Sequence, residues 1–268
     1  MSPDQTQALV AKCLVDPTFL AQVVDAAALA ELSDVTSEFA AMKELGAEER
    51  LRLQQFQGFI TKVKHNALRR VLPNTFRLLS SAGLELRFFM HFAKAYIIAR
   101  QAGPLPCAEH LDLLGPALAV FLGDTADVDA CTLTMEMFEH ERTLHDLPLG
   151  AAAAAANTRW VAIGNCVVVQ RHFDVVALAE ELQSGHSSVC PHRRTHYLLY
   201  QALPADATTR IREVDMPTAL ILNQLLAGRS EADIAQQMSA MIGRVVTAEE
   251  IGVFANEAID AGIIADPA

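Results

Sequence analysis

The sequence predicts a mainly α protein, in which a helical N-terminal domain is followed by a small α+β module. Two observations support this class. Apolar residues recur at steps of three and four as far as about residue 147, as on one face of a helix. Beyond the alanine run at 150–156, short segments rich in β-branched residues appear, which are typical of strands, and helical patterns then return. We therefore expect two domains, at 1–150 and 157–268.

Three helices are expected in the N-terminal domain. The first carries one apolar face formed by Leu53, Phe56, Ile60, Val63, Ala67 and Val71. Pro73 ends or kinks this helix. A second helix stops before Gly103-Pro104, and a third spans Asp127–Asp146.

The C-terminal module should begin with strands and end with helices. Trp160–Gln170 is dense in β-branched residues and contains a turn signal at Gly164-Asn165. Thr195–Leu203 and Arg210–Asp215 are expected to pair as strands. Three short helices follow, at Met216–Ala227, Ser230–Ser239 and Thr247–Ala261, the last two with capping-box openings. Strands followed by three short helices describe a winged-helix-like module.

Composition restricts where the protein works. No apolar run reaches the roughly 18 residues that a membrane helix needs, and the first residues lack the basic-then-apolar order of a signal peptide. Five scattered cysteines without a Cys-x-x-Cys pair suit buried thiols in a reducing compartment. We expect a cytoplasmic protein that does not bind a membrane.

Charge is distributed unevenly. The whole chain carries −11, yet residues 50–100 contain ten Lys or Arg and one acid, Glu85, a net charge of +9. Such a reversal often marks a surface that meets something negative, although a charge run is also commonly a solvated face. The candidate contacts with an acidic partner or peptide are Lys62, Arg69, Arg70, Arg77 and Arg87.

The same basic stretch resembles a known family. Phe56–Tyr96 is similar to the N-terminal helical domain of accessory subunits that serve multinuclear non-haem iron oxidative enzymes, which modify ribosomally made peptides. The helix Asp127–Asp146 is similar to the acidic, aromatic-bearing helix that follows in this family. The positions that match the family pattern are Phe56, Phe59, Asn66, Leu68, Pro73, Phe88 or Phe89, and Tyr96.

The C-terminal part resembles a peptide-recognition element of the peptide-chaperone type, on Thr218–Met238 and Thr247–Ile264. Similar subunits serve the biosynthesis of methanobactin (the C subunit) and of 3-thiaglutamate (the I subunit), and the long chain with both halves favours the second type. The resemblance implies a non-catalytic subunit that binds the leader of a precursor peptide. It would present the peptide's C-terminal cysteine to an enzyme that holds the iron, so no cofactor is expected in this chain.

The strand Arg210–Asp215 is the candidate docking edge. An exposed sheet edge can accept an extended peptide as an additional strand, and charged and apolar side chains alternate here, as on an edge with one wet face. An ordinary hairpin covered by its own helices explains the same pattern. The residues expected to bind peptide are Arg210, Ile211, Arg212, Glu213 and Val214, with Ile251, Phe254, Ala255 and Ala258 from the last helix.

Catalysis and metal binding find little support in the sequence. There is no GxSxG, phosphate-binding loop or HExxH motif, so no catalytic residue is expected. His186, Cys190, His192 and His196 cluster with a spacing that could hold zinc. Pro191 and the adjacent arginines oppose that interpretation, and we expect a polar loop and no metal.

The alternative function is a winged-helix transcription regulator. Residues 201–268 contain four Arg, no Lys and ten acids, a net charge of −6. The candidate recognition helix, Thr247–Ala261, contains neither Lys nor Arg. Because DNA binding requires several phosphate contacts, we do not expect a nucleic-acid partner.

Overall fold

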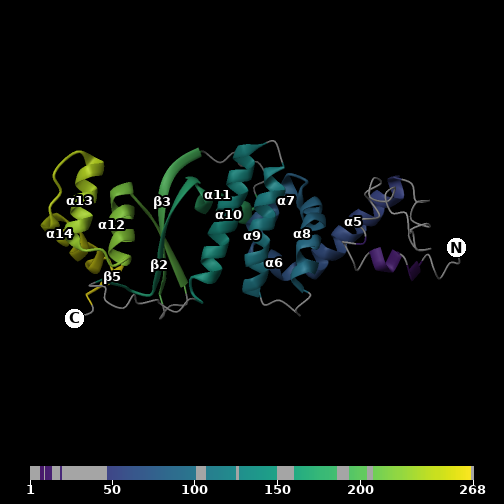
Figure 1. The fold of residues 1–268 in the computed structure, drawn as a ribbon, viewed down its shortest axis with the longest axis horizontal. Helices are drawn as coiled ribbons and strands as arrows, with labels where there is room; N and C mark the ends of the chain where they lie inside the picture. The colour runs from purple at the N-terminus through teal and green to yellow at the C-terminus, as the bar shows by residue number, and fades with distance from the viewer. Residues whose placement is uncertain are drawn as a thin grey trace, which may run out of the picture. The chain divides into compact units, whose positions relative to one another are not determined.

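A computed structural model describes residues 7–8, 10–13, 19, 47–100, 107–124, 127–149, 160–185, 193–203 and 208–266. The chain divides into two units, Met1–Phe138 and Glu139–Ala268. The division falls inside helix α10 (Val128–Asp146), whereas the alanine run at 150–156, where we expected the junction, lies outside the described residues. The described chain is mainly helical with a small antiparallel sheet, as the sequence predicts (Figure 1).

The first unit is built from helices. They are α5 (Ala47–Lys64), α6 (Asn66–Val71), α7 (Pro73–Ser81), α8 (Glu85–Arg100), α9 (Cys107–Gly123) and the first part of α10. The helix expected to run through Val71 is in fact interrupted at His65, so that α5 and α6 are separate. Pro73 stands in the first turn of α7, where its missing N–H costs no helical hydrogen bond.

Helix α9 was not expected, because Gly115 and Pro116 interrupt its apolar run. Both residues lie inside the helix. A Cβ atom at position 115 would lie 3.0 Å from Cε1 of Phe138, so the glycine permits the close approach of α9 to α10. Packing of its buried apolar residues thus stabilises α9, although glycine and proline have low helix propensity.

The core of the first unit is aromatic. Phe76 stacks on Phe89 with ring centroids 5.2 Å apart, and Phe88 lies 5.8 Å from Phe92. Phe121 of α9 meets Phe88 edge-on at 5.6 Å. These rings are buried together with leucines of α6, α7 and α9, so burial of large apolar side chains holds the helices together.

The second unit contains an antiparallel sheet of order β2-β3-β4. Its strands are β2 (Asn165–Phe173), β3 (Arg193–Leu203) and β4 (Thr208–Val214). Tyr200 of β3 is the register partner of Val167 on β2 and of Ile211 on β4. A separate antiparallel pair of short strands is formed by β1 (Val161–Ala162), just before β2, and β5 (Ile264–Ala265), just after α14.

Besides the end of α10, four helices accompany the strands of this unit among the described residues. They are α11 (Val175–Gln183), which the sequence analysis did not predict, and α12 (Met216–Leu226), α13 (Glu231–Ile242) and α14 (Ala248–Asp260), which it did. The last three start at the N-caps Asp215, Ser230 and Thr247, each accepting a hydrogen bond from an amide of the first turn. Figure 1 shows these three helices grouped together on one side of the sheet.

The sheet is covered on both faces. Side chains alternate between the faces of a strand. Leu199 and its partner Val168 lie in the core formed with α12, α13 and α14. Tyr200 points to the opposite face, where its hydroxyl lies 2.7 Å from Nδ1 of His140 on α10. The edges of the sheet are therefore its accessible parts.

None of the helices in the described part of the chain is both long enough and apolar enough to cross a lipid bilayer.

Candidate functional site

Strand β4 is an open edge of the sheet. It pairs with β3 on one side, and within the described ranges no strand pairs with its other side. An open edge offers unpaired amides and carbonyls at the spacing that an extended peptide requires. The hairpin expected from the sequence is therefore present, with the candidate docking strand on its outside.

The side chains of β4 divide between the two faces. Val214 packs against the core beneath α12–α14, and Nη1 of Arg212 donates a hydrogen bond to the carbonyl of Ala261, 3.3 Å away, just beyond α14. Ile211 alternates with Arg212 and so lies on the other face, where it is partly exposed. The edge thus has α14 beside one face and an accessible apolar residue on the other.

Most of the residues expected from the last helix do not reach the surface. Ile251, Ala255 and Ala258 are buried in the core of the second unit. Phe254 is partly buried and packs against that core. These four residues thus position α14, and of the four only Phe254 has exposed surface. Val253, which the sequence analysis did not select, is 55% exposed on the same helix.

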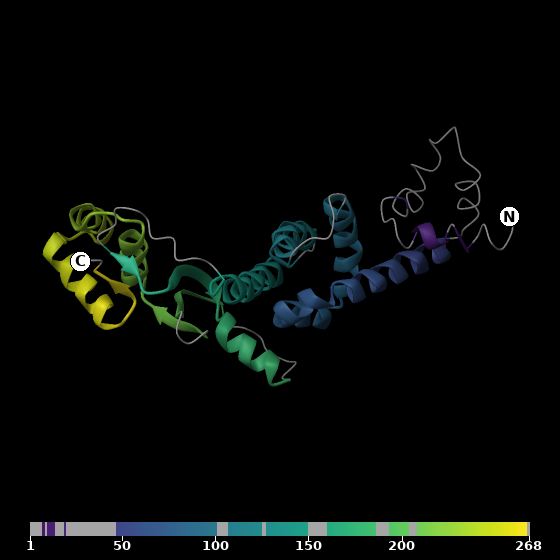
Figure 2. The same cartoon turned by 90° about the horizontal axis from the view of Figure 1, so that it is seen from below.

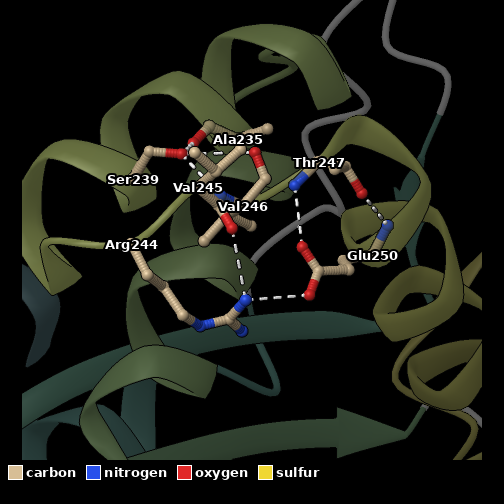
Figure 3. Close-up of polar contacts among 7 residues, drawn as sticks. All are labelled: Ala235, Ser239, Arg244, Val245, Val246, Thr247 and Glu250. Carbon is tan, nitrogen blue, oxygen red and sulfur yellow. Dashed lines mark hydrogen bonds and ion pairs between the residues drawn. The ribbon is translucent and has the colours of Figure 1, made fainter.

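The start of α14 is held by the turn that precedes it. Oγ of Ser239 donates to the carbonyl of Ala235 and accepts from the amide of Val246, both at 2.7 Å (Figure 3). Gly243 ends α13 with φ +74°, in the left-handed region that glycine adopts without strain. The turn between α13 and α14 is therefore fixed to the body of α13.

A charged contact continues this turn into α14. Nη1 of Arg244 donates to Oε1 of Glu250 at 3.0 Å, and Oε2 of Glu250 accepts from the amide of Thr247 at 2.8 Å (Figure 3). The hydrogen bonds from Thr247 and Arg244 lower the pKa of the Glu250 carboxyl. The predicted capping box is thus formed, and it fixes where α14 begins.

Two of the basic candidates in the first unit form ion pairs with a carboxylate of the same chain. Nζ of Lys62 lies 2.7 Å from Oε2 of Glu85, and Nε of Arg69 lies 2.9 Å from its Oε1. Glu85, the single acid of the basic stretch, is buried, and a buried carboxylate needs such partners. Lys62 and Arg69 therefore join α5 and α6 to α8, and the charge of Glu85 neutralises part of their positive charge.

Three other candidates, Arg70, Arg77 and Arg87, are exposed. They belong to α6, α7 and α8. Nη1 of Arg77 also donates to Oδ1 of Asn74 at 3.2 Å. Of the five basic candidates, these three lie most on the surface, whereas Lys62 and Arg69 are paired with Glu85.

The buried polar groups of the second unit are structural. His140 and Tyr200 are hydrogen-bonded and buried, and burial and the charge of Arg171 lower the pKa of His140 from 6.5 to about 4. Nη1 of Arg171 lies 2.6 Å from Oε2 of Glu139. A substrate has no access to the His140 ring, so it is a poor candidate for general acid–base catalysis.

The thiol of Cys166 is also unsuited to chemistry. Burial raises the pKa of Cys166 to about 11, although the charge of Arg212 acts in the opposite direction. The nucleophilic form of cysteine is the thiolate. Cys166 therefore stays a neutral thiol, and it packs against the core of the second unit.

The possible zinc cluster can be followed only in part. His186, Cys190 and His192 lie outside the described residues. His196 is buried on β3, with Nδ1 2.9 Å from the carbonyl of Arg194. In the ranges that the structure describes, no three His, Cys, Asp or Glu side chains converge as metal ligands.

Comparison with known proteins adds no family. No protein-family model matches this chain, and no curated protein sequence matches it significantly. A functional assignment therefore depends on the residues and their geometry.

Proposed function

We propose that this chain is a peptide-binding subunit, which holds the leader of a ribosomally made precursor peptide as an additional strand along β4. The open edge of β4 beside α14 is the observation that carries this proposal. Backbone groups would supply affinity, and Ile211 and Phe254 would select side chains of the peptide. The strand pair β3–β4, followed by the three helices α12, α13 and α14, supports a winged-helix-like recognition element.

The same proposal gives the first unit a docking role. Arg70, Arg77 and Arg87 would contact an acidic surface of an oxidative enzyme that holds multinuclear non-haem iron, as the family resemblance implies. Binding the leader would raise the local concentration of the peptide's C-terminal cysteine at that enzyme. The reaction needs no catalytic residue from this chain.

Charge disfavours the alternative of DNA binding. The exposed side chains of α14 include Glu249, Glu257 and Asp260, which would repel phosphates where a recognition helix needs cations. A mobility-shift assay at low salt separates the two functions, because a peptide-binding element should leave duplex DNA unshifted.

The direct test uses labelled leader peptides, encoded by reading frames beside the gene, and fluorescence anisotropy. Ile211→Lys should weaken binding at least about tenfold, the equivalent of about 1.4 kcal/mol, because it places a charge where an apolar side chain of the peptide would pack. Thr208→Lys adds the same charge at an exposed position of the same strand and should bind nearly as the unmodified chain. Equal affinity for all three proteins would exclude docking at this edge.

A second experiment tests the partner. Co-expression with neighbouring gene products should recover a complex that contains iron, and Arg70→Glu, Arg77→Glu and Arg87→Glu together should weaken it. If the isolated chain modifies the peptide by itself, the non-catalytic role is wrong.

A further inference from the structure

Strand β4 is basic on the face of the sheet that α12–α14 cover. Arg212 is the register partner of Leu199, which is buried in the core with these helices, and register partners share a face. Arg210 is exposed and lies two residues before Arg212, so it shares that face. Figure 2 shows α12–α14, in yellow-green to yellow, on one side of the sheet. Two arginines thus follow one another about 7 Å apart along the open edge.

Two hydrogen bonds place the end of α14 beside these arginines. Nε2 of Gln201, the register partner of Arg210, donates to the carbonyl of Gly262 at 2.6 Å. Nη1 of Arg212 donates to the carbonyl of Ala261 at 3.3 Å. Ala261 is the C-cap of α14, where the helix dipole is negative and a cation is favoured. The basic row of β4 therefore lies at the C-terminal end of α14.

The hydrogen bond of Arg212 is weak. An N–H···O bond usually spans about 2.7–3.2 Å, so the 3.3 Å to the carbonyl of Ala261 lies just beyond that range. A carboxylate can accept two parallel hydrogen bonds from one guanidinium, and such charge-assisted bonds are about twice as strong as neutral ones. An acidic side chain on an added strand can therefore replace Ala261 as the acceptor.

The other face of β4 favours an apolar side chain. Ile211 lies on that face, between the two arginines in sequence, and is partly exposed. Glu213 shares the face with Ile211, and its Oε2 accepts from Nη2 of Arg194 at 2.7 Å. Because the charge of Glu213 is balanced by Arg194 within the chain, a peptide need not supply a cation there. Ile211 is then the main contact for a peptide side chain on this face.

One exposed acid of α14 partly opposes the arginines. At about 100° per residue, Glu257 lies about 40° around the helix from Ala261, whereas Asp260 lies about 100° from it. Glu257 is therefore the acid of the last turn that lies nearer to Arg212, and it is exposed. The two arginines of β4 and Glu257 together still carry a net charge of +1. The charge beside the edge thus favours an anionic peptide.

We infer that the leader strand bound at β4 carries two acidic side chains two residues apart, which face Arg210 and Arg212, with an apolar side chain between them facing Ile211. This inference rests on the proposed function and names its substrate class, an acidic leader segment. Opposite charges at facing positions of adjacent strands stabilise the pairing, and like charges destabilise it. The order acid, apolar, acid reads the same in both directions, so it applies to a parallel or an antiparallel leader.

Fluorescence anisotropy with the labelled leader peptides, at about 50 mM salt to limit screening, tests this inference. A leader that binds should contain an acid–apolar–acid segment. Replacing both of its acids by lysine should weaken binding about tenfold or more, because like charges then face each other across the strands. Arg210→Glu combined with Arg212→Glu should weaken binding of the natural leader to a similar extent. Arg229→Glu, at an exposed arginine that follows α12, is the matched control and should bind like the unmodified chain.

Reversing the charges on both partners should restore binding. The lysine peptide should bind the doubly reversed protein at least severalfold more tightly than it binds the unmodified chain. Arg210→Glu alone, at the exposed position, should lose part of the affinity, so the test does not depend on the folding of the double variant.

The outcomes separate this inference from the proposed function. If the leader binds and Ile211→Lys weakens it, but the charge reversals leave its affinity unchanged, the inference is overturned while docking at β4 stands. A tightly bound leader without an acid–apolar–acid segment would overturn it as well. If no leader binds, or if Ile211→Lys binds as tightly as the unmodified chain, both the inference and docking at this edge are wrong.

Discussion

Helices α5 and α14 use the same periodic pattern in opposite ways. In α14, the residues at helical spacing, Ile251, Ala255 and Ala258, are buried in the core. In α5, the residues at helical spacing, Phe56, Phe59 and Val63, are exposed, and small or polar residues face α8. The comparison teaches that periodicity identifies a shared face of a helix, whereas packing decides whether that face meets the core or the outside.

Shortening one side chain in each helix should give the largest difference in stability between the buried face of α14 and the exposed face of α5. Ile251→Ala removes methylene groups from a core and should cost the second unit about 2–4 kcal/mol. Val63→Ala removes exposed atoms and should change the stability of the first unit by less than about 0.5 kcal/mol. Trp160, the single tryptophan, is buried in the core of the second unit, so its fluorescence during urea unfolding reports on Ile251→Ala. Circular dichroism reports on Val63→Ala; similar losses in both variants would contradict the contrast.

The second unit should also lose stability in acid. The pKa of His140 is lowered from 6.5 to about 4 in the folded chain. Between these two pH values, the unfolded chain therefore binds a proton at this histidine and the folded chain does not. Stability is unaffected above pH 6.5 and falls as the pH drops from 6.5 to 4, by about 3 kcal/mol in all. Urea unfolding followed at Trp160 should show this slope, and His140→Gln should flatten it; an unchanged slope would assign it to other groups.

The mid-helix glycines give a smaller pair of effects. Gly58→Val in α5 meets Met90 and Leu86 and should destabilise the first unit by about 1–3 kcal/mol. Gly252→Ala in α14 meets nothing within 4 Å and should stabilise the second unit by about 0.5–1 kcal/mol. Thermal unfolding measures both. A neutral Gly58→Val would mean that α5 does not depend on close contact with α8.

The cap of α14 should account for the smallest loss. Thr247→Ala removes the side-chain oxygen that accepts from the amide of Glu250 at 3.2 Å, and should cost about 1 kcal/mol. Thr247→Ser keeps that oxygen and should cost less. If both variants lose the same stability in urea, the cap does not determine where α14 starts.

Local sequence signals predicted much of the second unit. Ser230 and Thr247 predicted the starts of two helices, because a capping side chain bonds an amide only three residues further along the chain. The strand pair β3–β4 was also predicted, with alternating charged and apolar side chains over Arg210–Asp215. Helix α11 was missed although Asp174 caps it by accepting from the amide of Ala177, a signal of the same kind that could have located it.

Features that depend on distant contacts could not be predicted in this way. The net charge of residues 50–100 did not indicate that Glu85 is buried and forms ion pairs with Lys62 and Arg69. Helix α9 keeps Pro116 because its neighbours bury its apolar side. On α14, helical spacing grouped Phe254 with Ile251, but only packing in the core decides that Ile251 is buried and Phe254 is partly exposed.

Hydrogen–deuterium exchange with and without a bound leader peptide tests the proposed docking edge most directly. The amides of Thr208–Val214 on the open side of β4 should gain protection, because the peptide would supply the carbonyls that this edge lacks among the described residues. Protection gained elsewhere with β4 unchanged would contradict peptide addition at this edge.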